Sequence, residues 1–101
     1  MSIVAPKSPP ASTPKGQREV DQIRQIGSSH GGKVLARQLS GVRHYITITL
    51  SMDADSPQLR AMLRAIEFAI RGQFDRGRRL QGMTQFVAKS RLIDVQVRCV
   101  D

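Results

Sequence analysis

One segment of this chain has a helical period long enough to limit how the rest can fold. Between residues 56 and 79, apolar side chains recur every three or four positions, and at about 100° per residue they fall on one side of a helix. The residues of this apolar stripe are Leu59, Met62, Leu63, Ile66 and Ile70. Ser56 suits the N-cap and Pro57 the first helical position. The spacing predicts one main helix that ends at Gly72 or Gly77 and whose apolar stripe must be covered.

Alternating segments supply the cover. Residues 42–50 and 92–100 alternate between apolar and polar side chains, which is typical of half-buried strands. Residues 83–88 form a shorter strand candidate. Residues 33–39 fit either a short helix or a strand, and we favour the strand because the glycines and serine on both sides leave little room for a helix.

The order of these elements predicts the fold class. With a short helix at residues 17–26, the chain reads (α)ββαββ, which predicts an α+β fold. We expect a single small domain, residues 17–101, with an antiparallel sheet of about four strands packed on one main helix. Residues 1–16 are rich in proline, serine and lysine and contain no acidic residue, a composition that predicts a disordered basic tail.

Charge is the composition feature that bears on function. The formal net charge is +8, from 16 lysine and arginine residues against 8 acidic ones. This balance favours polyanionic partners, namely nucleic acid (DNA or RNA), an anionic membrane surface or an acidic protein. A solvated basic surface without any partner is the alternative. No apolar run reaches transmembrane length, so we expect no membrane span and a cytoplasmic protein.

Catalytic motifs are missing or incomplete. Residues 27–33 have the glycine and lysine spacing of a phosphate-binding P-loop, but Val34 stands where a serine or threonine would hold Mg²⁺. We attribute the match to chance and expect a flexible loop. The single cysteine, Cys99, excludes an internal disulfide and a cysteine-based zinc site within one chain. His30 and His44 belong to no ligand-spaced cluster. We therefore expect no enzyme activity, no catalytic residues, no metal site and no cofactor.

Arginines are the strongest candidate for a binding surface. Three lie along one flank of the predicted helix and three more crowd its end, and Lys33 follows the glycine segment. Guanidinium groups bind phosphate bidentately, so these residues predict a nucleic-acid contact. Tyr45 is the one aromatic predicted on the outer face of the sheet, so we expect the contact to be made mainly with the backbone and not by base stacking. The predicted contact residues are Arg60, Arg64, Arg71, Arg76, Arg78, Arg79 and Lys33. The alternative is that they complement the helix dipole and keep the surface soluble.

Phe68 points away from the apolar stripe, together with Ala61 and Ala65. A large aromatic beside two alanines on the exposed side of a helix predicts a second contact surface. A lone exposed aromatic is an equally good interpretation. If the surface is real, the chain is a protein–protein interaction or self-assembling module without catalytic activity. Its partner would be a second copy in a homo-oligomer or an acidic protein.

Overall fold

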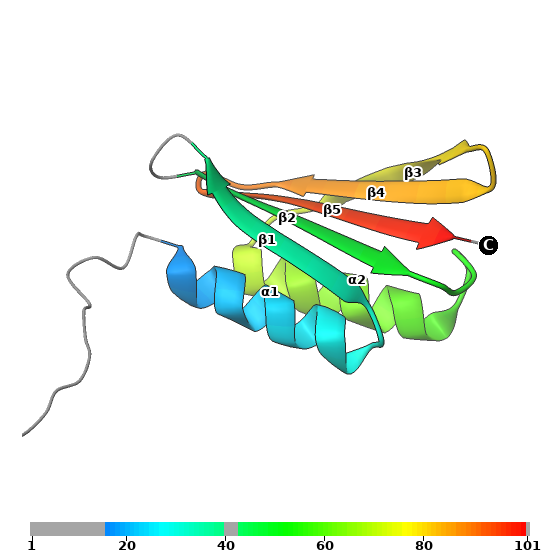
Figure 1. The fold of residues 1–101 in the computed structure, drawn as a ribbon, viewed down its shortest axis with the longest axis horizontal. Helices are drawn as coiled ribbons and strands as arrows, with labels where there is room; N and C mark the ends of the chain where they lie inside the picture. Colours follow the sequence, from blue (N-terminus) through cyan, green and yellow to red (C-terminus); the bar gives the residue numbers. More distant parts are fainter. Residues whose placement is uncertain (1–15, 40–42, 101) are drawn as a thin grey trace, which may run out of the picture.

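Five strands form one mixed sheet, and both helices cover the same face of it (Figure 1). The computed structural model describes residues 16–39 and 43–100, with the side chains of residues 38, 39 and 76 left aside. The elements are α1 (Gln17–Ser29), β1 (Lys33–Leu39), β2 (Arg43–Leu50), α2 (Pro57–Ile70), β3 (Phe74–Leu80), β4 (Met83–Lys89) and β5 (Ile93–Val100). The α+β class and the strand at residues 33–39 are confirmed. The predicted tail lies outside the described residues apart from Gly16.

Strand order departs from the prediction of about four antiparallel strands. The order is β1-β2-β5-β4-β3, and β5 lies at the centre, parallel to β2 and antiparallel to β4. The parallel pair follows from the crossover, because the chain leaves β2 through α2 and returns through the β3–β4 hairpin before it reaches β5. Alternation in a sequence indicates a strand and its buried face, but it carries little information on the neighbouring strand.

The segment after α2 is a strand, which corrects the prediction that its arginines crowd the helix end. α2 ends at Ile70 because Arg71 adopts a left-handed conformation, with φ of 53°, and donates its backbone N–H to the Glu67 carbonyl. The N–H of Phe74 donates to the Glu67 carboxylate at 2.9 Å, which holds the start of β3 beside the helix. Arg76, Arg78 and Arg79 therefore belong to β3, an edge strand.

Gly27 does not end α1, and the first part of the expected glycine loop, residues 27–29, is helix. The helix runs through Gly27 to Ser29, and Gly27 is buried. A Cβ atom at this position would lie 2.7 Å from Cγ2 of Val34 and 3.1 Å from Cδ1 of Ile48. The absence of a side chain therefore lets α1 approach β1 and β2 closely. Lys33 is the first residue of β1, so this segment does not form a phosphate-binding loop.

The core lies between the sheet and the two helices. Ile66, in the middle of the α2 stripe, is fully buried, and it shares one apolar cluster with Ile23 of α1 and Val95 of β5. Cys99 is buried in the same cluster as a small core residue. The core thus lies on the helix side of the sheet, and no described element packs on the other face.

Candidate nucleic-acid interface

No described element covers the face of the sheet opposite the helices, which we call the open face (Figure 1). It carries the alternate residues of each strand, such as Tyr45 and Thr47 on β2 and Gln96 on β5. These side chains are exposed or partly exposed, whereas Ile46, Ile48 and their neighbours on the other face are buried. Strand alternation therefore separates the core from a broad outward surface.

Three cations of the open face lie in a single line across the sheet. Lys33 pairs with Thr49, Thr49 with Arg98, Arg98 with Gln85, and Gln85 with Arg78. We call Lys33, Arg98 and Arg78 the basic row. Neighbouring cations of the row are two strands apart, a backbone separation of about 10 Å. The row thus places cationic side chains on β1, β5 and β3, three strands spread over the whole width of the sheet.

Arg98 is the central member of the row and has unused hydrogen-bonding capacity. Its Nη2 donates to Gln96 Oε1 at 3.3 Å. Its Nε is buried, and no acceptor for this N–H lies among the described residues. A buried donor without an acceptor is costly, but this N–H is not accessible from the surface, so an anion on the open face meets the charge of the guanidinium and not Nε.

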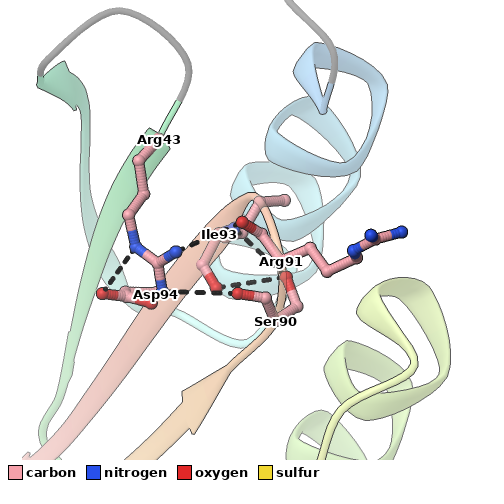
Figure 2. A network of polar contacts seen from close by, with 5 residues as sticks. All are labelled: Arg43, Ser90, Arg91, Ile93 and Asp94. Atoms are coloured by element: carbon pink, nitrogen blue, oxygen red, sulfur yellow. Dashed lines mark hydrogen bonds and ion pairs between the residues drawn. The ribbon is translucent and has the colours of Figure 1, made fainter.

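The carboxylates of the open face do not cancel its positive charge. Besides the row, the open face carries two further exposed cations, Arg37 and Lys89, against the carboxylates of Asp75 and Asp94. Asp94 accepts hydrogen bonds from Nε and Nη2 of Arg43 on the neighbouring strand (Figure 2). Because that carboxylate is already paired, it offers little repulsion to an incoming anion.

Arg43 itself braces the sheet. Its Nη1 donates to the Arg91 carbonyl at 3.2 Å and its Nη2 to the Ser90 carbonyl at 3.3 Å, so one guanidinium joins β2 to the β4–β5 turn (Figure 2). The hydrogen bond to Asp94 raises the pKa of Arg43 above its ordinary value. The guanidinium therefore keeps its charge throughout the pH range in which proteins are studied. We assign Arg43 a structural role and leave it out of the contact set.

A shallow hollow of about 460 Å³ lies on the open face beside the basic row. Its lining comes from two directly paired positions on β1 and β2, Arg37 with Tyr45 and Leu35 with Thr47. The side chain of Leu35 is 61% exposed and that of Tyr45 is 38% exposed. An aliphatic side chain and an aromatic ring are thus presented to solvent among cations.

The structure divides the predicted contact residues between two sides of the molecule. Lys33 and Arg78 lie on the open face. Arg60 and Arg64 are exposed on α2, and Arg71 is exposed at its C-cap, in the helix layer on the other side of the sheet. Arg79 is exposed and pairs with Thr84, whose side chain lies on the helix side, and the side chain of Arg76 lies outside the described part of the structure. These residues do not form one surface.

The predicted contact residues do not include Arg37, Lys89 and Arg98, which the structure places on the open face. The alternation of residues 92–100 does place Arg98 outward, so that signal was present. The sequence pattern does not give the strand order. Arg98 lies in line with Lys33 and Arg78 because β5 is the central strand.

The predicted contact surface around Phe68 lies on the helix layer. Phe68 is 88% exposed, Ala61 is exposed and Ala65 is partly buried. A second hollow, of about 680 Å³, runs between the helices and is lined by Gln22, Ile26, Ala65, Phe68, Ala69 and Arg71. The exposed ring therefore stands at the edge of a groove with a mainly apolar lining.

Two other features, a cluster of metal ligands and a membrane-spanning helix, are not found in the described structure. Within residues 16–39 and 43–100, no three histidine, cysteine, aspartate or glutamate side chains gather as metal ligands. Among the helices of the described part, none is both long and apolar enough to cross a membrane. Comparisons with protein-family models, curated proteins and solved structures found no significant match.

Proposed function

We propose that this protein is a small basic accessory protein that binds nucleic acid through phosphate contacts on the open face. The basic row carries the proposal, because its regular spacing presents separate cations to a repeating polyanion. Arg37 and Lys89 extend the positive surface along the strands on one side of the row, because both are level with Asp94, four residues from Arg98 on β5. Phosphate contacts position a nucleic acid without reading its sequence, so binding is expected to be sequence-independent.

Salt dependence provides the test. Each phosphate neutralised by a lysine or arginine releases counterions, so the affinity falls steeply as salt rises. The first variant combines Lys33→Gln, Arg78→Gln and Lys89→Gln on the open face. We expect it to bind a labelled oligonucleotide more weakly, with the log–log salt slope smaller by about one unit for each lost contact on duplex DNA.

The matched control removes the same charge from the helix layer, with Arg18→Gln, Arg60→Gln and Arg64→Gln. These residues are also exposed, so net charge is equal in the two variants and only the location differs. We expect the control to keep nearly the full salt slope. An equal loss in both variants would mean that net charge alone governs binding, and no binding at low salt in the unmodified protein would exclude the proposal.

A second function, protein–protein interaction, has support from the groove beside Phe68. The exposed ring, the apolar lining and the nearby cations of Arg64 and Arg71 favour a partner segment with an apolar side chain among acidic residues. A second copy of the chain fits less well, because symmetric pairing through α2 would bring arginines of the two copies together.

Selection from a displayed random-peptide library tests this second function. Peptides that bind the full chain but not Phe68→Ser should carry aspartate or glutamate around one large apolar residue. They should still bind Gln25→Ser, an exposed α1 control. If enriched peptides ignore Phe68, the groove is not the site. Self-association that Phe68→Ser abolishes would assign the groove to a second copy instead.

A further inference from the structure

We propose that the hollow beside Tyr45 stacks one nucleobase, so that the preferred ligand of the open face is single-stranded nucleic acid. This inference rests on the proposed function, which by itself requires only phosphate contacts. It adds a base-binding position to them and thereby selects the form of nucleic acid.

The lining of the hollow matches a flat aromatic ligand attached to an anion. Tyr45 supplies a ring and Leu35 an aliphatic surface that is mostly exposed to water. Arg37 pairs directly with Tyr45 across the two strands, so its guanidinium is available to stack on a base or to meet its phosphate. Thr47 adds a hydroxyl group at the wall.

The position of the hollow connects it to the basic row. Leu35 and Thr47 are each two residues from the row positions Lys33 and Thr49 on the same strands, a separation of about 7 Å. A nucleotide whose base occupies the hollow thus has its phosphate beside Lys33 and the row. The backbone can then continue across the sheet over Arg98 and Arg78.

The accessibility of the base faces determines whether a single strand or a duplex can fill the hollow. In a duplex the base faces are stacked on one another, whereas an unpaired base turns out of its strand and stacks on an aromatic side chain. Duplexes can still contact the basic row, but they cannot fill the hollow. Phe68 lies in the helix layer, and Phe74 and Phe86 pack against the core. Tyr45 is therefore the aromatic residue available to the hollow, and one base per protein is stacked. Sequence preference should be weak, because every base has a π-face.

Tyrosine fluorescence reports directly on this site. The chain contains one tyrosine and no tryptophan, so its intrinsic emission on excitation at tyrosine wavelengths comes from Tyr45. The probes are an oligothymidylate, an abasic oligonucleotide of the same length and a duplex of the same length. We expect the oligothymidylate to quench the emission, whereas the abasic strand binds without comparable quenching.

Affinity ratios complete the experiment. From anisotropy of labelled strands, we expect the unmodified protein to prefer the oligothymidylate over the abasic strand by about 5- to 100-fold. Tyr45→Leu and Leu35→Ser should each reduce this ratio towards one, while Tyr45→Phe should keep it. Lys33→Gln should weaken binding of both strands and leave their ratio unchanged, because it removes only a phosphate contact.

Each contrary result has a distinct meaning. Equal binding of the abasic and base-bearing strands, or tighter binding of the duplex, would overturn the stacking inference while the phosphate surface remained. Absence of binding to all three probes would overturn both proposals. Displacement of the oligothymidylate by an equal charge concentration of polyglutamate would identify the open face as a surface for acidic protein and would likewise overturn both.

Discussion

Glycine normally destabilises the interior of a helix, yet α1 contains a buried glycine, Gly27, near its end. The position is buried against Val34 and Ile48, where even a methyl group would be too close to β1 and β2. Sequence pattern alone favoured a helix stop here, because glycine is the usual residue at helix ends. The close approach of a helix to a sheet has no local signature, and the packing role of Gly27 follows only from the structure.

Gly27→Ala should therefore destabilise the domain, by about 1–3 kcal/mol, as expected for overpacking a core contact. At an exposed helix position the same substitution would stabilise the protein, since alanine is the better helix former. Urea denaturation of the variant measures the free energy of unfolding. Ser28→Ala, at the exposed neighbouring position, is the control and should be close to neutral. A Gly27→Ala protein of unchanged or greater stability would contradict the close packing of α1.

The two ends of α2 differ in how well the sequence predicts them. Ser56 is the confirmed N-cap of α2, and its Oγ accepts from the Gln58 N–H at 3.1 Å. The end of α2 was not predictable in the same way, because the left-handed residue is Arg71 and not the adjacent Gly72. A side chain that hydrogen-bonds a free N–H identifies itself by type, whereas a non-glycine residue with positive φ does not.

At the level of elements, the arginine-rich segment 74–80 forms a strand that the sequence pattern does not predict. β3 has little apolar alternation because it is an edge strand, and a bulge between Asp75 and Arg78 breaks its register with β4. A Cβ atom on Gly77 would lie 2.5 Å from the Gln85 carbonyl oxygen, so glycine is required at the bulge. The hairpin turn that follows has positive φ at both Gln81 and Gly82, as a two-residue type I′ turn requires.

Among the contacts that join different strands, the hydrogen bonds of Arg43 should contribute measurably to thermal stability. Arg43→Met removes the link between β2 and the β4–β5 turn, and Asp94→Asn removes only the charge that it meets. Both variants should lower Tm, Arg43→Met the more, because the Ser90 and Arg91 carbonyls also lose a donor. In a double-mutant cycle the two losses should be less than additive. Strict additivity would show that the pair is not coupled.

At the scale of the molecule, the sequence predicts the α+β fold class more reliably than the order and direction of the strands. The stripe of α2 and the alternation of β2 and β5 each need a partner surface, which leaves an α+β layer structure as the simple solution. Strand order, the parallel β2–β5 pair and the placement of both helices on one face depend on contacts distant in the sequence. The net charge indicated a polyanion, but the register of the strands decides which cations share a surface.

Because the helices occupy one face only, the two proposed binding surfaces lie on opposite sides of the sheet and should act independently. Phe68→Ser should leave oligonucleotide affinity and its salt slope unchanged, since Phe68 lies in the helix layer, away from the basic row. The open-face variant with Lys33→Gln, Arg78→Gln and Lys89→Gln should in turn bind groove-selected peptides as the unmodified protein does.

Both effects can be read from one pair of titrations, with the oligonucleotide and with a peptide selected on the Phe68 groove. The peptide should bind the preformed oligonucleotide complex, giving a ternary species by anisotropy and by mass. Acidic peptides lower the local positive potential, so the comparison belongs at moderate salt, where charges further apart than about 8–10 Å are largely screened. Competition that persists there, or a loss of oligonucleotide binding in Phe68→Ser, would mean that the nucleic acid wraps around the edge of the sheet onto α2. In that case Arg60, Arg64 and Arg71 would return to the contact set alongside the basic row.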